Sequence, residues 1–332
     1  MSTDIKDIKQ EIKYFLLVNF GLIAFISIFL FISSSKPEGS VFITNFGGVF
    51  MYIPAFSVIV VLKKVSNYEF NPKVEKFFKF FAIATIVRII VAILDVLVFK
   101  NIITSSVVDA CVSLYLLGVV LFNASEFESI NLSLNKNLKK VLIVVAIFLA
   151  ILITKIVITA ILDESSTINL KGAILTVIMS LVMNFFLGFN LFFGEEFGWR
   201  YFLQPRLQKL YGKKSGVLIL GFIWGIWHLP LCFTLYSPKT PIFCVILHVT
   251  YCMLLGVFLG YAYMKTENIW CPILIHLANN SIIVILAGGY ESVITPGDLL
   301  MNIVLNGIFF LPFLFAKEYK SKAIEEQSNL DL

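Results

Sequence analysis

The sequence has few charged residues for its length. Of its 332 residues, 14% are Asp, Glu, Lys or Arg, whereas a soluble domain usually contains about 25%. In contrast, 59% are hydrophobic, and the mean hydropathy is +0.92. This balance excludes an ordinary soluble globular protein. It predicts an integral membrane protein whose architecture is set by bilayer-spanning segments.

The sequence also lacks the usual marks of secretion and of disulfide bonding. The apolar run after the polar first dozen residues is long enough to span and has no small-residue cleavage site, so it predicts a retained first span. No two cysteines form a C-x-x-C pair, and all five lie in apolar runs. We therefore expect small buried side chains, not disulfides or a thiolate metal site, at Cys111, Cys232, Cys244, Cys252 and Cys271.

Apolar runs long enough to cross a bilayer, about 20 residues each, recur along the chain. They predict an all-α, polytopic transmembrane helical bundle with about ten spans. The expected spans are 14–33, 41–62, 77–99, 102–122, 140–162, 172–194, 215–236, 241–264, 269–289 and 298–316.

The distribution of basic residues orients these spans. With the N-terminus placed in the cytoplasm, 20 of the 26 lysines and arginines fall in cytoplasmic segments. Arg88 and Lys155 lie inside spans, and the opposite side holds only Lys36, Lys100, Lys171 and Lys239. Because cytoplasmic loops of membrane proteins are enriched in Lys and Arg, both termini are expected inside. Topology thus accounts for the net charge of +5 without a nucleic-acid partner.

No soluble domain, long linker or internal repeat is evident. The longest polar connection, "NASEFESINLSLNKNLKK", divides the chain into two groups of helices. We expect four transmembrane helices in 1–134, six in 135–316, and a short cytoplasmic tail in 317–332.

Ionisable residues inside spans cost about 2.5–3.5 kcal/mol on insertion scales, so each one needs a reason. All three histidines, His228, His248 and His276, lie in predicted spans. The adjacent carboxylates Glu195 and Glu196 follow the expected span 172–194 and precede all three histidines. A single buried histidine is usually a packing partner that hydrogen-bonds a neighbouring helix, but this clustering favours a functional site.

In "EEFGWR", Glu196 and Arg200 are four residues apart and are expected to form an ion pair on one helical face. Glu195 is rotated by about 100° from Glu196, so it faces another partner. The alternative is an interfacial ion pair that merely ends a helix.

Two further elements carry polar side chains. In "WGIWHLPL", Pro230 is expected to kink the helix beside His228, and Gly221 and Gly225 permit close approach of another helix. In "HLANN", His276 and Asn280 are four residues apart, so their two donors share one face, as an oxyanion site requires. The alternatives are helix-packing roles for both. His248 is expected in the outer half of its span, with packing as its role.

The three elements together resemble the CPBP family, the CAAX proteases and bacteriocin-processing (Abi) proteins, and their flanking residues look like its bacterial branch. The resemblance covers roughly 180–290. The motifs stand as Glu195-Glu196…Arg200, Trp224…His228 and His276…Asn280. The family often has phenylalanine where this chain has Trp224, and both are expected to act as aromatic packing residues.

The resemblance implies an intramembrane endopeptidase whose active site opens to the cytoplasm, in a multi-pass protein of the bacterial plasma membrane. It implies that Glu195 and His228 activate a water and that His276 and Asn280 stabilise the oxyanion. Glu196 and Arg200 match supporting positions. The expected substrate is a membrane-embedded or lipid-anchored peptide or protein; relatives act on prenylated CAAX proteins or serve bacteriocin immunity and peptide maturation.

Two alternatives stay open for the chemistry. Glu195, His228 and His276 would suit a catalytic zinc site, but the sequence has no H-E-x-x-H motif, and a metal-free glutamate mechanism is slightly preferred. Two other functions are also compatible. The chain would be a transporter or channel if Arg88, Asp95, Asp109 and Lys155 served transport instead of structure, or a protease-like immunity or scaffold protein that does not cleave.

Overall fold

The computed structural model describes residues 5–36, 39–162, 170–286 and 293–320, and these residues form helices but no β-strand. The predicted all-α helical membrane architecture is confirmed. The elements are α1 (Ile5–Ser34), α2 (Gly39–Lys64), α3 (Pro72–Leu94), η1 (Asp95–Phe99), α4 (Ile103–Phe122), η2 (Ala124–Ile130), α5 (Leu138–Leu162), α6 (Leu170–Leu187), α7 (Phe189–Glu196), η3 (Phe197–Leu203), α8 (Gln204–Tyr211), α9 (Lys213–Trp227), α10 (Leu229–Leu231), η4 (Cys232–Tyr236), α11 (Pro241–Thr266), α12 (Trp270–Leu286), α13 (Pro296–Phe310), η5 (Leu311–Phe315) and η6 (Lys317–Tyr319).

Seven helical segments among the described residues are long and apolar enough to cross a bilayer, or nine if each of two bent pairs is one span. The helix α12 is apolar but shorter, with 17 residues. The number of ten spans and the orientation of both termini therefore stay predictions, as does the division at residues 134 and 316. The end of the run 269–289 beyond residue 286 and the tail beyond residue 320 lie outside the described residues.

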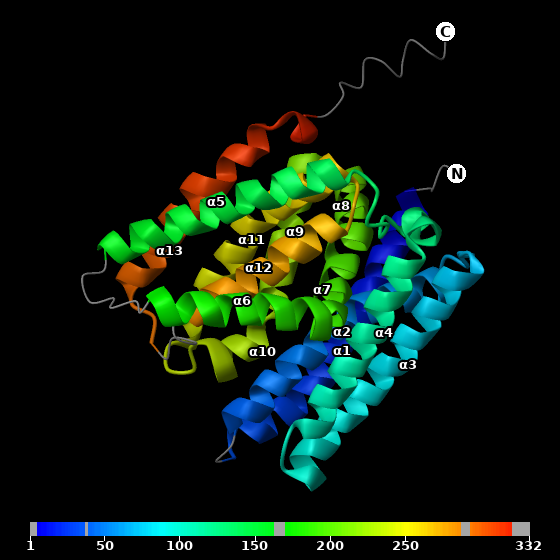
Figure 1. Cartoon of the computed structure of the whole chain (residues 1–332), viewed down its shortest axis with the longest axis horizontal. Coiled ribbons are helices and arrows are strands. Elements are labelled where there is room, and N and C mark those ends of the chain that lie inside the picture. The colour runs from blue at the N-terminus through cyan, green and yellow to red at the C-terminus, as the bar shows by residue number, and fades with distance from the viewer. Residues whose placement is uncertain (1–4, 37–38, 163–169, 287–292, 321–332) are drawn as a thin grey trace.

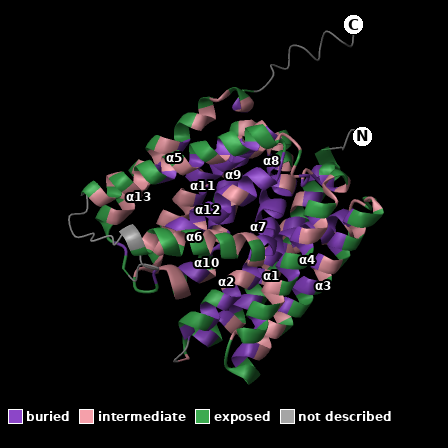
Figure 2. Cartoon of the chain, in the orientation of Figure 1, coloured by how far each residue is buried: buried purple, intermediate pink, exposed green. Residues whose placement is uncertain are grey.

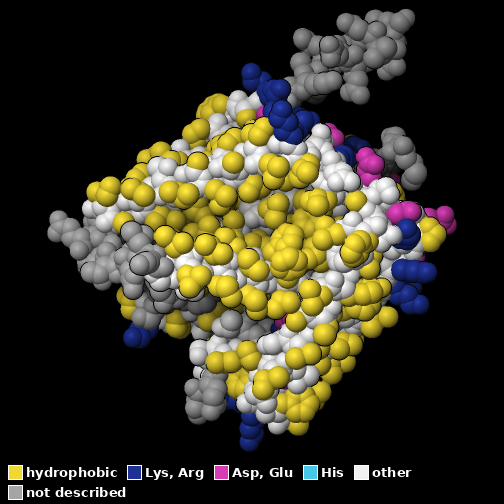
Figure 3. All heavy atoms as spheres, viewed as in Figure 1, with side chains coloured by type: hydrophobic (Ala, Val, Ile, Leu, Met, Phe, Trp, Pro, Cys, Tyr) yellow, Lys and Arg dark blue, Asp and Glu magenta, His cyan; other side chains and the backbone are white. Residues whose placement is uncertain are grey.

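Two sets of helices lie on either side of α7 and α8 (Figure 1). On one side α1–α4 pack against one another, and on the other side α12 lies between α5 and α6 while α11 packs on α9. Buried residues concentrate where the two sets meet, and exposed residues cover the outer helices (Figure 2). The face in Figure 3 is mostly hydrophobic, and most of its charged side chains lie along the edge near both chain ends.

The run 172–194, expected to be one span, is instead broken. The helix α6 ends at Leu187, and the following helical segment Phe189–Tyr211 turns away by 72°. The break occurs at Gly188, whose amide still bonds back to Asn184. A glycine inside an apolar run does not change its hydropathy, so the sequence pattern could not reveal the turn. The expected kink beside Pro230 is confirmed, because Lys213–Trp227 and Leu229–Tyr236 meet at 45°.

Two charged residues of the first helices, Arg88 and Asp109, form a largely buried ion pair. Arg88 of α3 donates to Asp109 of α4 at 2.7 Å and to Ser105 at 2.9 Å. The hydroxyl of Tyr52 also donates to Asp109, at 2.7 Å, and Asn45 contacts Asp95. These contacts are those of an ion pair that stabilises the packing of α3 on α4, which is the simpler alternative to a role in transport. They favour a structural role over a transport role for Arg88 and Asp109.

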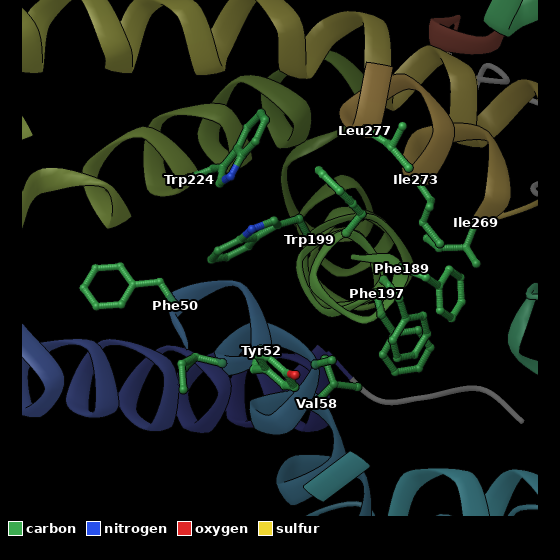
Figure 4. Close-up of a cluster of buried hydrophobic side chains, with 14 of the residues drawn as sticks. Phe50, Tyr52, Val58, Phe189, Phe197, Trp199, Trp224, Ile269, Ile273 and Leu277 are labelled. Carbon is green, nitrogen blue, oxygen red and sulfur yellow. The ribbon is translucent and has the colours of Figure 1, made fainter. Parts of the chain in front are cut away.

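The helix α7 and the turn η3 lie directly on α2. A Cβ added to Gly194 would overlap the backbone of Met51, and one added to Gly198 would overlap Pro54. Small residues let helix backbones approach this closely in a membrane protein. The segment that carries the glutamates is therefore packed against the N-terminal helices. In Figure 4, Tyr52 of α2 lies beside the helical segment that carries Phe197 and Trp199.

We expect Gly198→Ala to destabilise the folded protein, because the added methyl has to push α2 away from η3. Overpacking of a tight contact typically costs about 1–3 kcal/mol. Thermal unfolding in detergent would show a lower midpoint. The control is Gly21→Ala, since a Cβ on Gly21 of α1 meets no atom within 4 Å. Equal behaviour of the two variants would contradict the close packing of η3 on α2.

Candidate active site

The two glutamates end α7, where the helix changes its winding. Residues Phe197–Leu203 form a π-helical turn directly after Glu196, and such turns occur frequently at functional sites. Both side chains are almost fully buried, with 2% of Glu195 and none of Glu196 exposed. Carboxylates this deep in apolar helices need partners of their own.

Glu196 has a basic side chain on each side. Its Oε2 lies 3.1 Å from Nε of Arg200, and its Oε1 lies 2.8 Å from Nδ1 of His276 on α12. The predicted pair of Glu196 and Arg200 is thus confirmed. The Arg200 nitrogens are not aligned for hydrogen bonds to described residues, so the attraction is ionic. The guanidinium also lies over the ring of Trp224, 4.7 Å from its centroid.

Glu195 has a different partner, as the helical geometry predicts. The indole Nε1 of Trp224 donates to its Oε2 at 2.9 Å. Trp224 is therefore more than the aromatic packing residue expected from the sequence, because phenylalanine could not donate this hydrogen bond. The two carboxylates, adjacent in sequence, are held by separate elements.

His228 is also positioned by Trp224. The helix α9 ends at Trp227, and Nδ1 of His228 lies 2.8 Å from the backbone oxygen of Trp224. A carbonyl oxygen only accepts, so Nδ1 carries the proton and the Nε2 lone pair of the neutral ring is available. The Trp224 ring lies 5.9 Å from that of His228 and 5.6 Å from that of His276, between centroids.

Asn280 is joined to its neighbour and not directly to the other predicted residues. Its Oδ1 accepts from Nδ2 of Asn279 at 3.2 Å, and Asn279 in turn accepts from the hydroxyl of Tyr251 at 2.6 Å. This arrangement leaves the Nδ2 donors of Asn280 directed elsewhere. The side chain is half-buried, more accessible than that of Asn279.

His248 joins this cluster, although a packing role was expected for it. Its ring lies 4.4 Å from that of His228 and 5.0 Å from that of Tyr236, between centroids. The sequence carried one signal, since Gly221 and Gly225 predicted a close helix partner. That partner is α11, where a Cβ on Gly225 would lie 2.6 Å from Cα of Val249, the residue after His248.

The expected zinc ligands Glu195, His228 and His276 do not form a compact set. Among the described residues, the ligand atoms of His228, His248 and Cys252 are the ones that lie within 4.8 Å of one another. Cys252 is buried, as expected, whereas Cys111 is exposed on α4 and the expectation of burial was wrong there. The arrangement offers two buried carboxylates, three imidazoles and an accessible amide in one apolar region.

Comparison with protein families gives a match over the same segment. Residues 173–282 fit the model described as type II CAAX prenyl endopeptidase Rce1-like. We call residues 173–282 the Rce1-like core because of their similarity to this model. The resemblance to the CPBP family is thus confirmed over about a third of the chain, and it indicates a protease. No curated protein and no solved structure matches the chain.

If Trp224 orients Glu195 through its indole N–H, then Trp224→Phe should lower kcat for peptide cleavage by about 10- to 100-fold. A hydrogen bond to a charged group contributes about 1.5–3 kcal/mol, whereas phenylalanine keeps the aromatic packing and the backbone oxygen that binds His228. Cleavage of a membrane peptide by purified protein in detergent would measure the effect.

Trp227→Phe is the matched control. Trp227 lies on the same helix and also loses a buried hydrogen bond, from its Nε1 to Asn19 at 2.8 Å, but that bond does not involve a carboxylate. Both variants should lose some thermal stability. If kcat falls in proportion to thermal stability in both variants, the positioning role of Trp224 is contradicted.

Proposed function

We propose that this chain is an intramembrane endopeptidase that hydrolyses peptide bonds of membrane-associated proteins or peptides. The observation that carries the proposal is the contact of Glu195, His228 and His276 with Trp224 inside apolar helices. Glu196 joins this group through His276. Buried charge of this kind is costly to keep. The Rce1-like core supports the same reaction class.

In the proposed mechanism, Glu195 and His228 activate the attacking water. Glu195 is the general base, held by one hydrogen bond from Trp224 on Oε2. The Nε2 of His228 accepts a hydrogen bond from the same water, since Nδ1 is occupied by the Trp224 oxygen. A general base of this kind typically contributes about 100- to 10,000-fold to the rate.

His276 and Asn280 stabilise the negative oxygen that forms on the substrate carbonyl. With Nδ1 of His276 donating to Glu196, the imidazolium form carries a second N–H on Nε2 that faces another acceptor. The carboxylate of Glu196 balances the positive charge of that form. The Nδ2 of Asn280 supplies the second donor, as oxyanion stabilisation requires.

Each proton and bond is then accounted for. The water oxygen bonds to the carbonyl carbon while Glu195 takes the water proton. The tetrahedral intermediate collapses, the C–N bond breaks, and Glu195 passes the proton to the leaving amine. Arg200 holds Glu196 in place throughout. This sequence is the glutamate-dependent alternative, and no step in it uses a metal.

The substrate class follows from the surroundings of the site. The residues lie among helices that are apolar enough to span a bilayer, so the substrate is a membrane-embedded or lipid-anchored chain, with prenylated CAAX proteins as one candidate. We place the protein in a bacterial plasma membrane with its site open to the cytoplasm, on the strength of its basic-residue distribution.

Glu195→Gln tests the proposal, because the amide keeps the shape of the side chain but cannot take a proton. Purified, reconstituted protein would be incubated with membrane peptides, prenylated and unmodified, and the products identified by mass spectrometry. We expect cleavage by the wild type and a loss of about 100- to 10,000-fold in the variant. Glu128→Gln, on the exposed side of η2, is the control and should cleave normally. Full cleavage by Glu195→Gln would refute the mechanism.

A further inference from the structure

A compact set of metal-ligating side chains lies beside the proposed hydrolytic residues. The ligand atoms of His228, His248 and Cys252 are all within 4.8 Å of one another. His248 and Cys252 are four residues apart on α11 and therefore share one helical face. His228 faces them from the end of α9. The proposed peptide hydrolysis uses neither His248 nor Cys252.

The close approach of α9 and α11 creates this set. A Cβ on Gly221 would lie 2.5 Å from Cα of Met253, the residue after Cys252. Gly225 makes the equivalent contact beside His248. Larger residues at either glycine would separate the helices. The three side chains are thus held together by helix packing that does not depend on a bound ion.

The free lone pairs point to a ligand. In His228, Nδ1 donates to the Trp224 oxygen at 2.8 Å, which is the usual outer contact of a metal-binding histidine and leaves Nε2 for the metal. In His248, Nε2 is buried and has no hydrogen-bond partner among the described residues. A buried polar atom without a partner costs about 1–3 kcal/mol, and coordination would remove that cost.

The spacing suits a tetrahedral ion. Zinc binds imidazole nitrogen at about 2.0–2.1 Å and thiolate sulfur at about 2.3 Å, so the ligand atoms of such a site lie about 3.3–3.8 Å apart. In the structure the ligand atoms lie within 4.8 Å of one another, so binding has to draw them closer by about 1 Å. We propose that His228, His248 and Cys252 bind a divalent cation of the zinc class.

The ligand types favour a divalent ion of the zinc class. Binding releases the Cys252 thiol proton, so the thiolate contributes a negative charge that stabilises a bound cation. Imidazole and thiolate ligands select zinc or cobalt and disfavour magnesium and calcium.

Metal content of the full chain tests this directly, without any assay of cleavage. Protein purified in detergent with a tag that contains no histidine would be analysed by mass spectrometry after dialysis against zinc. We expect about one zinc per chain and no retained magnesium or calcium. His248→Gln and Cys252→Ser should each bind zinc at least about tenfold more weakly, since even loss of an outer contact costs about 10- to 100-fold.

Cys244→Ser is the matched control, because Cys244 is buried on the same helix two turns before Cys252 but is not one of the three ligands. Its zinc content should equal that of the wild type. Glu195→Gln and His276→Gln test the alternative in which the ion is bound by Glu195, His228 and His276. Loss of zinc in those two variants, with normal zinc in Cys252→Ser, would overturn the proposal.

Cobalt(II) binding gives a test that uses only the wild-type chain, so its result does not depend on whether a variant folds. Cobalt(II) added to the wild-type chain should produce an intense near-ultraviolet band from thiolate-to-metal charge transfer, and zinc should abolish it. Cobalt that binds without that band, or a chain that binds neither ion, would refute coordination by Cys252. The result is independent of whether the chain cleaves peptides, so failure of the metal site would leave the proposed hydrolysis standing. A bound ion would take the Nε2 lone pair of His228, and Glu195 would then be the one group left to accept a proton from the attacking water.

Discussion

A carboxylate that is removed from water needs its charge balanced, and the pairing of Glu196 with Arg200 and His276 meets this requirement at the centre of the molecule. The glutamate and the arginine are fully buried. Removing one member of such a group leaves an unpaired charge, which typically costs about 3–5 kcal/mol. Because His276 belongs to α12 and Arg200 to η3, the same interaction joins α12 to the segment that carries both glutamates.

Trp224 adds a second connection of a different kind. Its indole N–H binds Glu195, its backbone oxygen binds His228, and its ring lies under Arg200. Trp224 therefore links Glu195 directly, and Glu196 through Arg200, to the end of α9. The neighbouring aromatic side chains fill the space around it, and in Figure 4 Trp199 lies between Trp224 and Phe50. Dense packing of this kind keeps polar groups in a single arrangement.

The sequence predicted local features well. Apolar run lengths located most helices to within a few residues, and the four-residue spacing of Glu196 and Arg200 predicted their ion pair because a helix dictates it. Relations between helices were harder. The turn at Gly188, the hydrogen bond from Trp224 to Glu195 and the contact of His248 with His228 depend on which helices lie side by side. Hydropathy contains no such information, and the glycine pair of α9 indicated a close neighbour without saying which helix it was.

The dependence of η3 on α2 has a consequence for how the protein is made. Gly194 and Gly198 lie against residues 51–54, which the ribosome delivers to the membrane well before the glutamates arrive. The surface that receives the Rce1-like core is thus synthesised first. His276 and Asn280 come near the end of translation, so a nascent chain would hold its proposed base and water before it has any means of stabilising an oxyanion. The proposed oxyanion donors are therefore the last part of the site to reach the membrane.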